Sequence, residues 1–408
     1  MKSNISLQEA INLMLGHAAA TKNARKSHLF ELYGKILATN LMVRKSLPAF
    51  DNSAMDGYAI KLCDTGKSIP IGGTILAGDT GKITLKEGEC CKVMTGAPIP
   101  LGTEAVVPFE NARLSGGIVE IPREIKQGVN IKCAGEELNT GEELFSAGEE
   151  LGSYQIALLA SQGYSVIPTY APLRIALYSS GNELIEPWEK AQTHQIYNAN
   201  ASMLLGTLKR FGFSADYLGV LPDNLEAMSR AVALFEHYDA VITSGGVSAG
   251  EADFMEQVLK NAGMRTIFHG VNVKPGHPMM MGILNKTILL CLPGNPLSAA
   301  LNLHFLGIPM LRKLQGNKAY HLEYVCAENK EPISLKGNRA NMILGRLEEG
   351  RFLAHRGGKY GSGMLTPLAQ SNALIFCAQG RSEIAAGERV KVIPYNCNFS
   401  PEESNIFN

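Results

Sequence analysis

Residues that could bind an anion and a divalent metal ion gather in one run of the second half, AVITSGGVSAGEADFMEQVLK. Its apolar, β-branched start is typical of a buried strand, and Ser244, Gly245 and Gly246 then predict a turn. Helical spacing resumes after Asp253, and the unpaired N–H groups at such a helix start favour a phosphate or another oxyanion. Glu251 and Asp253 would repel that anion unless Mg²⁺ lies between them. The run therefore predicts an anion site with Mg²⁺, although a glycine turn alone is as typical of simple packing.

Two more strand–turn–helix junctions share this plan, LRIALYSSGNEL and LLCLPGNPLSAALNLHFLG, and VNVKPGHPMMMG places Lys274 and His277 around a Pro-Gly turn. The candidate binding residues are Ser180 and Gly181 in the first junction and Pro293, Gly294, Asn295, Pro296 and Ser298 in the second. Ligands of parallel sheets bind beyond the carboxyl ends of the strands, where these turns fall. We therefore expect the three turns and the lysine loop to share one pocket.

The first half contains two loops that could bind a ligand. LPAFDNSAMDGYAI carries Asp51 and Asp56 between apolar ends and enters a strand, although an ordinary turn would have the same composition. MTGAPIP holds Thr95 and Gly96 ahead of two prolines, which suits either a hairpin tip or a binding loop.

The elements around these loops indicate several domains, since 408 residues exceed one ordinary core. Ser6 and Glu9 form a predicted capping box before an amphipathic helix, and a second helix is expected over 27–40. Short alternating segments over 69–121 predict a small β-barrel or sandwich, and a helix is expected over 154–162.

From Leu173 the chain alternates strands with helices, which predicts a parallel sheet with helices on both faces. From Tyr320 it returns to short strands and glycine turns, which predicts a small all-β domain.

The composition excludes several classes of protein. The 38 basic and 38 acidic residues cancel, which argues against a nucleic-acid binder. No run approaches the roughly 20 apolar residues of a membrane span, and no signal peptide is seen, so we expect a cytoplasmic protein with no membrane contact. The eight cysteines show no CxxC pair, and we expect neither a zinc site nor a disulfide framework.

Together the runs DNSAMDGYA, MTGAPIP, SSGNEL, QIYNANASML, SGGVSAGEADF, VKPGHP and LPGNPLSA resemble the molybdopterin molybdenumtransferases of the MoeA type, which also form the C-terminal domain of gephyrin. The resemblance implies a helical linking domain in two segments, an inserted β domain, a molybdopterin-binding αβ domain and a C-terminal β-barrel. We place the linking segments at 1–44 and 141–171, the inserted domain at 45–140, the αβ domain at 172–319 and the barrel at 320–408.

The resemblance also implies the reaction, which is Mg²⁺-dependent insertion of molybdate into adenylylated molybdopterin with release of AMP. It implies a homodimer in which Asp56 and Thr95 of one subunit complete the site of the other. The implied catalytic residues are Asp56, Thr95, Asp253 and Lys274, and the implied Mg²⁺ ligands are Asp56, Glu251 and Asp253. The protein that makes the adenylylated precursor and the recipient molybdoenzymes are the expected partners.

This chain departs from the family pattern by losing charge. The family has aspartates where Asn182 and Asn198 stand, a lysine in place of His277, an arginine in place of Leu344 and a GED run at 135–137. An alternative function is therefore that of a weakened member, which binds or carries molybdopterin or the molybdenum cofactor without efficient metal insertion. A gephyrin-like scaffold is a third class, with no support from the sequence.

Overall fold

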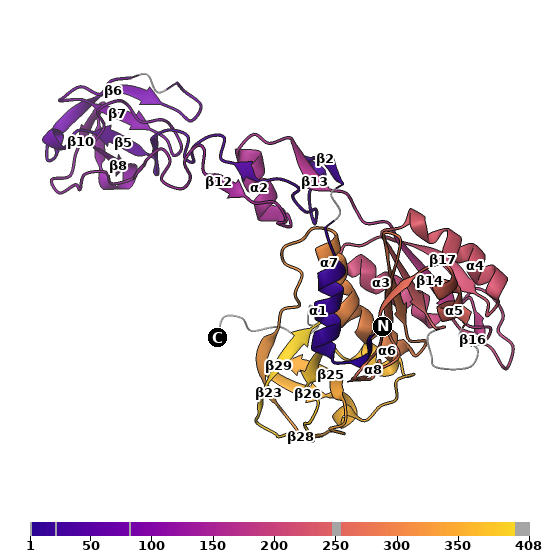
Figure 1. Ribbon diagram of the computed structural model, residues 1–408. Helices are drawn as coiled ribbons and strands as arrows, with labels where there is room; N and C mark the ends of the chain where they lie inside the picture. Colours follow the sequence, from indigo (N-terminus) through magenta and orange to yellow (C-terminus); the bar gives the residue numbers. More distant parts are fainter. Residues whose placement is uncertain (1, 21–22, 81–82, 247–253, 396–408) are drawn as a thin grey trace.

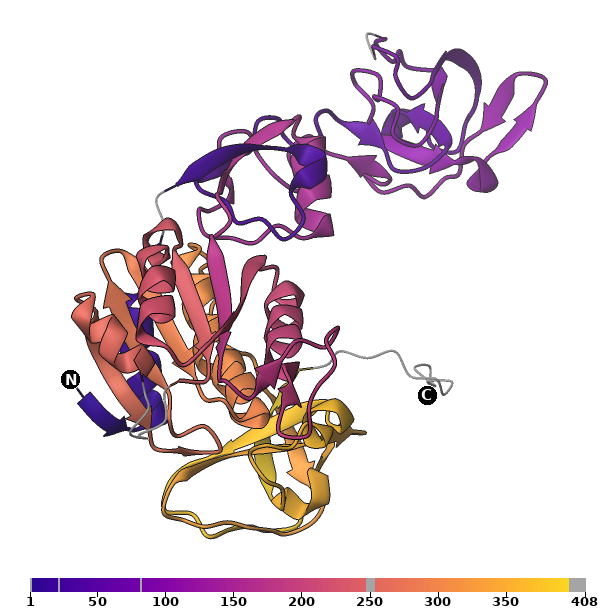
Figure 2. The ribbon, with the colours of Figure 1, turned by 90° about the vertical axis from the view of Figure 1, so that its right-hand side faces the viewer.

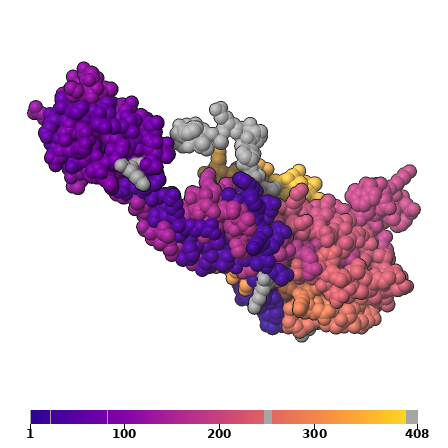
Figure 3. Space-filling view, turned by 90° about the horizontal axis from the view of Figure 1, so that it is seen from above, coloured from indigo at the N-terminus to yellow at the C-terminus, as the bar shows by residue number. Residues whose placement is uncertain are grey.

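The computed structural model describes residues 2–20, 23–80, 83–246 and 254–395. The chain is elongated, with an αβ domain and a β-barrel at one end and a small β domain at the other (Figure 1, Figure 2). A linking part joins the two ends, and Figure 3 shows the small β domain projecting from the rest of the molecule.

The αβ domain is built on a seven-stranded sheet of order β1-β19-β21-β22-β18-β14-β17. The strands are β1 (Lys2–Ile5), β14 (Ile175–Ser180), β17 (Ala215–Leu221), β18 (Ala240–Ser244), β19 (Arg265–Val271), β21 (Met280–Leu284) and β22 (Thr287–Leu292). Strands β22, β18, β14 and β17 are mutually parallel, as predicted, whereas β21 runs antiparallel to both β19 and β22. The sheet is therefore mixed, because the tight turn between β21 and β22 leaves no room for a crossover.

Helices cover both faces of this sheet. One core cluster packs four helices on one face, and a second cluster packs two on the other. The first group is α1 (Leu7–His17), α3 (Ala199–Arg210), α6 (Pro296–Asn302) and α7 (Ile308–Leu314), with a π-helical turn at Leu303–Gly307; the second is α4 (Leu225–Ala233) and α5 (Phe254–Asn261). A short ribbon, β15 (Leu184–Ile185) with β16 (Ile196–Tyr197), follows β14.

Two predictions for the N-terminal segment are wrong. The capping box is present, since Ser6 Oγ accepts from Glu9 N at 3.2 Å, but β1 pairs with β19 and α1 packs against α7, so residues 2–17 belong to the αβ domain and not to the linking part. The helix expected over 27–40 is absent. Its first residues belong to β2 (Ala24–His28), which pairs with β13 (Val166–Tyr170), and a single 3-10 turn follows at Leu29–Glu31. Ile36 and Leu37 then form isolated bridges to Glu150 and Thr169, so the backbone hydrogen bonds of this segment go to distant residues and not to a helix.

The linking part contains a single α-helix, α2 (Ser153–Ser161), among its described residues, together with the β2/β13 ribbon and a second ribbon of β3 (Leu41–Met42) and β12 (Glu143–Phe145). Its small core lies between these elements, around Leu32, Leu37, Leu151, Leu159 and Ile167. The chain passes from the linking part into the inserted domain and returns to the linking part afterwards.

The inserted domain is a six-stranded sheet of order β8-β5-β7-β6-β10-β9. The strands are β5 (Gly57–Ile60), β6 (Ser68–Ile75), β7 (Cys90–Val93), β8 (Ala105–Pro108), β9 (Arg113–Ser115) and β10 (Ile118–Glu120), and β4 (Asn52–Ser53) pairs separately with β11 (Ile131–Lys132). Neighbouring Cys90 and Cys91 pack into different cores on the two faces, and burial raises the pKa of each thiol to about 11. The seven cysteines that the structure describes are all free thiols, so those residues form no disulfide.

The C-terminal domain is a barrel, closed because β25 pairs with both β26 and β27. Its strands are β23 (Val325–Asn329), β25 (Ala340–Glu348), β26 (Arg351–Ala354), β27 (Ala373–Cys377) and β29 (Arg389–Pro394), with α8 (Thr366–Gln370) and a ribbon of β24 (Ile333–Ser334) and β28 (Glu383–Ile384). Barrel residues Met342, Leu344 and Leu374 belong to the same core cluster as the αβ domain. The two domains therefore form one continuous packed body.

The predicted fold class is confirmed: an αβ domain, an inserted β domain, a linking part and a C-terminal barrel are all present. No helix among the described residues is both long enough and apolar enough to cross a membrane.

Candidate functional site

The three predicted turns meet at one edge of the αβ sheet, because β14, β18 and β22 are adjacent parallel strands. Gly245 N donates to Leu292 O at 3.0 Å, which ties the turn after β18 to the end of β22. Gly245 has a φ of 96°, and a Cβ there would lie 2.3 Å from Ser180 O and one on Gly294 would lie 3.7 Å from Gly245 Cα. Glycine is therefore required at 245 for the three turns to touch.

Asn200, at the start of α3, links two of these turns. Its Nδ2 donates to Ser244 Oγ at 2.7 Å and to Gly294 O at 2.8 Å. The Ser244 side chain is almost completely buried. Sequence reasoning noted the run QIYNANASML but did not single out Asn200; its only signal was an amide in the first turn of a helix.

A separate set of contacts closes the turn after β14. Asn182 Oδ1 accepts from Asp223 N at 3.0 Å, and Ser180 Oγ donates to Asp223 Oδ1 at 3.4 Å. Asp223 is therefore part of this loop, which the sequence did not indicate. Asn182 holds the loop through its oxygen, which an aspartate would also supply.

Asn198 is buried and caps α3. Its Oδ1 accepts from Ser179 Oγ at 3.1 Å and from Ala201 N at 3.3 Å, and its Nδ2 donates to Tyr217 OH at 2.7 Å. Tyr217 in turn donates to Glu186. Burial and the Glu186 carboxylate raise the pKa of Tyr217, so its hydroxyl keeps its proton.

Next to the turns, a cavity of about 680 Å³ lies between the αβ domain and the barrel. Its αβ wall is formed by 273–278, Asn295 and Ser298, and its barrel wall by 334–336, Arg339, 341–343 and 358–362. The three turns and the lysine loop were predicted to share one pocket, and of that set Lys274, His277, Asn295 and Ser298 line this cavity. Ser180, Gly181, Ser244, Gly245, Gly246, Pro293, Gly294 and Pro296 do not line the cavity and belong to the adjacent turns.

Backbone pairing fixes the two walls against each other. Lys274 lies on β20 (Val273–Lys274), which adds to the barrel sheet with Lys274 opposite Asn341 on β25. Leu297 N, in the first turn of α6, donates to Ser362 O at 3.1 Å. The walls therefore cannot separate without breaking sheet and turn hydrogen bonds.

Two polar side chains, the half-buried His277 and the buried Asn302, hold the backbone of the lysine loop. His277 Nδ1 donates to Val271 O at 2.9 Å, because a carbonyl can only accept. Asn302 is fully buried and donates to Gly276 O at 2.8 Å, and a Cβ on Gly276 would lie 2.5 Å from Asn302 Oδ1. Asn302 was also missed; an amide inside the apolar run SAALNLHFLG was its one signal.

Asp56 and Thr95 form a tight pair on the inserted domain. Asp56 Oδ1 accepts from Thr95 N and from Thr95 Oγ1, each at 2.7 Å. These bonds, with the backbone donor contributing most, lower the pKa of Asp56, which is therefore a carboxylate at neutral pH. The pair adjoins the ends of β5 and β7, and Figure 1 shows these strands at the opposite end of the molecule from the αβ domain and the barrel that form the cavity. One chain therefore does not bring together the two groups that the sequence assigned to a single site.

The predicted Mg²⁺ ligands are only partly visible. Glu251 and Asp253 lie outside the described residues. Over the part of the chain that the structure covers, no group of three or more acidic, histidine or cysteine side chains could hold a metal ion. Asp56 fits the role chemically, since a carboxylate oxygen is a preferred Mg²⁺ ligand and Thr95 holds Oδ1 through both donors.

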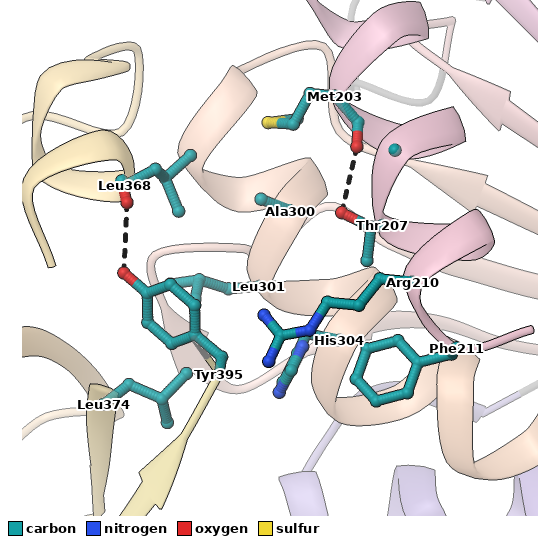
Figure 4. A pocket seen from close by; sticks show the side chains of 11 residues that line it. Met203, Thr207, Arg210, Phe211, Ala300, Leu301, His304, Leu368, Leu374 and Tyr395 are labelled. Atoms are coloured by element: carbon teal, nitrogen blue, oxygen red, sulfur yellow. Dashed lines mark hydrogen bonds between the residues drawn. The ribbon is translucent and has the colours of Figure 1, made fainter. Parts of the chain in front are cut away.

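A second cavity, of about 290 Å³, lies between α3, α6 and the barrel and contains none of the predicted site residues (Figure 4). Arg210, His304 and Tyr395 line it, and the His304 ring lies 5.3 Å from that of Phe211. Burial, with a smaller contribution from Arg210, lowers the pKa of His304 to about 4. His304 is therefore a neutral core residue at physiological pH.

Comparison with known proteins agrees with this arrangement. Family models match three segments of the chain: the MoeA N-terminal region (domain I and II) over 5–163, a probable molybdopterin binding domain over 176–313, and the MoeA C-terminal region (domain IV) over 327–395. The crystal structure of the molybdopterin biosynthesis moeA protein from Pyrococcus horikoshii OT3 superposes with a TM-score of 0.83 at 27% identity, covering 96% of this chain and all of that one.

Curated relatives match over nearly the full length. The molybdopterin molybdenumtransferase of Haemophilus influenzae is 33% identical, with 96% of this chain and 99% of that protein aligned. The enzyme of the same name from Nostoc sp. is 30% identical over 95% and 93%. The resemblance expected from the sequence is thus confirmed, and the chain belongs to the MoeA-type family of molybdopterin molybdenumtransferases.

Proposed function

We propose that this protein acts in molybdenum cofactor biosynthesis in the cytoplasm, where it inserts molybdate into adenylylated molybdopterin with release of AMP in a Mg²⁺-dependent reaction. The observation that carries the proposal is the cationic cavity beside three glycine-containing turns. Lys274 offers positive charge, and the side chains of Asn295 and Ser298 offer hydrogen-bond donors, which suit molybdate and the substrate's phosphates. The names of the full-length relatives support the same reaction class.

The second part of the proposal is a homodimer with shared sites. The inserted domain, which carries Asp56 and Thr95, lies at the distal end of the elongated chain (Figure 1), and a second copy would bring the pair to the cavity of its partner. Asp56, with Glu251 and Asp253, would then hold Mg²⁺, which neutralises the pyrophosphate charge as the adenylyl group leaves. Thr95 keeps the Asp56 carboxylate oriented and ionised.

The reaction is tested with purified protein, adenylylated molybdopterin, molybdate and Mg²⁺, with AMP release measured as the product. We expect AMP release that requires both molybdate and Mg²⁺ and that is lost in Asp56→Ala. Binding of the pterin nucleotide without AMP release would identify the alternative function of a binder or carrier. An AMP yield unaffected by Asp56→Ala would contradict the proposed role of the inserted domain.

Subunit sharing is tested by complementation. Asp56→Ala and Lys274→Ala impair different walls of the site, so each homodimer should be inactive while a mixed dimer keeps one intact site. Co-expression of the two at equal levels should therefore restore about a quarter of wild-type activity, because about half of the dimers are mixed and each has one working site of two. No recovery, with mixed dimers demonstrated by differential tags, would refute sharing.

A further inference from the structure

The barrel wall of the large cavity carries three side-chain cations that the sequence did not single out, Lys336, Arg339 and Lys359. Together with Lys274 from the αβ domain, these side chains give the cavity lining a formal charge of +4. None of the lining residues is an aspartate or a glutamate. The chain as a whole is neutral, with 38 basic and 38 acidic residues. This concentration of positive charge is therefore a local feature of the cavity.

These four charges have no carboxylate partner in the part of the chain that the structure describes. None of the four side chains forms an ion pair with a carboxylate in the described ranges, although ten ion pairs are present elsewhere in them. Like charges that share a cavity repel one another, so their placement costs stability unless an anion joins them. The cavity is thus suited to an anionic ligand.

The backbone beneath the barrel cations is held by specific contacts. Asn341 is buried and donates through Nδ2 to Arg339 O at 2.9 Å. Tyr360, next to Lys359, accepts from Leu344 N at 2.6 Å. The lysine side chains are exposed and Arg339 is half-buried. The charged ends of these side chains can therefore move to contact a ligand, while the backbone that carries them stays fixed.

The size of the cavity indicates what kind of anion it takes. A volume of about 680 Å³ is far more than one tetrahedral oxyanion needs, and it lies within the roughly 300–1,000 Å³ of small-molecule sites. Molybdate alone would engage only part of the wall. An organic molecule with a diphosphate would fill more of the cavity and would place its phosphates in a space lined by both the barrel cations and Lys274.

We infer that Lys336, Arg339 and Lys359 form the phosphate-binding wall that positions the diphosphate of an organic substrate, so that the barrel determines affinity for that substrate while the αβ turns hold the oxyanion. This inference rests on the proposed function for the identity of the substrate. Leu344, by contrast, is fully buried in the core on β25, so the cation that this segment gives to the cavity is Arg339, directly before β25, and not position 344.

The test uses ADP as the diphosphate probe and molybdate as the small oxyanion, with binding to the full-length protein measured by calorimetry at low salt. Replacement of all three barrel cations by glutamine should weaken ADP binding by about 30-fold, as expected for the loss of several charge-assisted contacts, and change molybdate binding by less than about 3-fold. The matched control replaces Lys330, Arg351 and Lys391, which carry the same charges on the barrel and do not line the cavity.

Three results would overturn the inference: no ADP binding by the wild type, unchanged ADP binding in the cavity variant, or an equal loss in the control. Circular dichroism of each variant shows whether the fold is kept, and single substitutions replace the triple if it is not. AMP release is measured separately. A wild type that binds ADP through the three cations but releases no AMP would remove the proposed function and leave the phosphate wall intact.

Discussion

The replacement of Asn200 by alanine should loosen the turns that flank the cavity. Asn200 reaches from α3 to both the turn after β18 and the turn after β22, through bonds of 2.7 Å to Ser244 Oγ and 2.8 Å to Gly294 O. Alanine removes both bonds and keeps the helix, since it is the best helix former. The change is therefore confined to the contact between the turns.

The two bonds should contribute about 1 kcal/mol each, net of their exchange with water. Ser244 is 2% exposed, so its hydroxyl would lose a partner without gaining water, which costs about another 1 kcal/mol. Gly294 is exposed, and its carbonyl can be hydrated at little cost. The expected loss of local stability is thus about 3 kcal/mol, or a factor of about 100 in the opening equilibrium.

Hydrogen exchange measured by mass spectrometry is the suitable assay, because global unfolding of a multidomain chain need not be two-state. Gly245 N–H, which bonds to Leu292 O, reports on the affected turns, and its exchange should accelerate about 100-fold. Ser202→Ala is the matched control, since Ser202 Oγ donates within α3, to Ala199 O at 3.0 Å, and has no other partner among the described residues. Exchange at Gly245 that rises less than about 3-fold in Asn200→Ala would refute the reasoning.

Three further predictions follow from the same geometry. Thr95→Val removes the side-chain donor to Asp56 and should raise the pKa of that carboxyl, followed by carboxyl NMR; an unchanged pKa would contradict the pairing. The pKa of His304 is about 4 in the folded state and 6.5 in the unfolded state, so the unfolded state binds more protons between these two pH values. The free energy of unfolding should therefore rise by about 3 kcal/mol as the pH increases from 4 to 6.5. Thermal melts of His304→Phe should lack this rise, and an equal slope in both proteins would contradict it. Gly263→Ala places its Cβ in open space and should cost about 1–2 kcal/mol for its positive φ alone, whereas Gly245→Ala adds a clash at 2.3 Å and should cost at least about 3 kcal/mol in chemical unfolding. Equal losses would show that the clash is relieved.

Local patterns predicted the parts of this fold that depend on short-range physics. The turns at Ser180, Gly245 and Pro293 could be predicted from the sequence. A buried strand, a tight turn and an amphipathic helix each have a characteristic pattern of apolar and turn-forming residues. The shared edge followed from parallel pairing, which places successive strand ends together. The junction at Pro293 leads directly into α6 as expected, whereas the one at Ser180 differs, since the β15/β16 ribbon follows β14 and α3 begins only at Ala199.

Features that depend on pairing between distant segments were not visible. Residues 27–40 have adequate helix formers, but β13, more than a hundred residues later, pairs with Ala24–His28 and overrides that preference. Lys336, Arg339 and Lys359 look like ordinary surface charges in the sequence, and only closure of the barrel against the αβ domain brings them to one wall. Asn200 and Asn302 likewise acquire roles only from the turns that fold against them.

The structure indicates why the side chain at position 198, where the resemblance leads us to expect an aspartate, is a neutral asparagine. Its side chain is 1% exposed and satisfied on both ends, with the oxygen capping α3 and the amide donating to Tyr217 OH. Tyr217 uses its own proton toward Glu186, so a group at 198 must donate to that hydroxyl, which an ionised aspartate cannot do. An aspartate here would leave a buried charge beside Glu186 and an acceptor without a donor. Asparagine at 198 is therefore the residue that this neighbourhood requires, and its neutrality reflects the Glu186–Tyr217 chain more directly than a loss of catalysis.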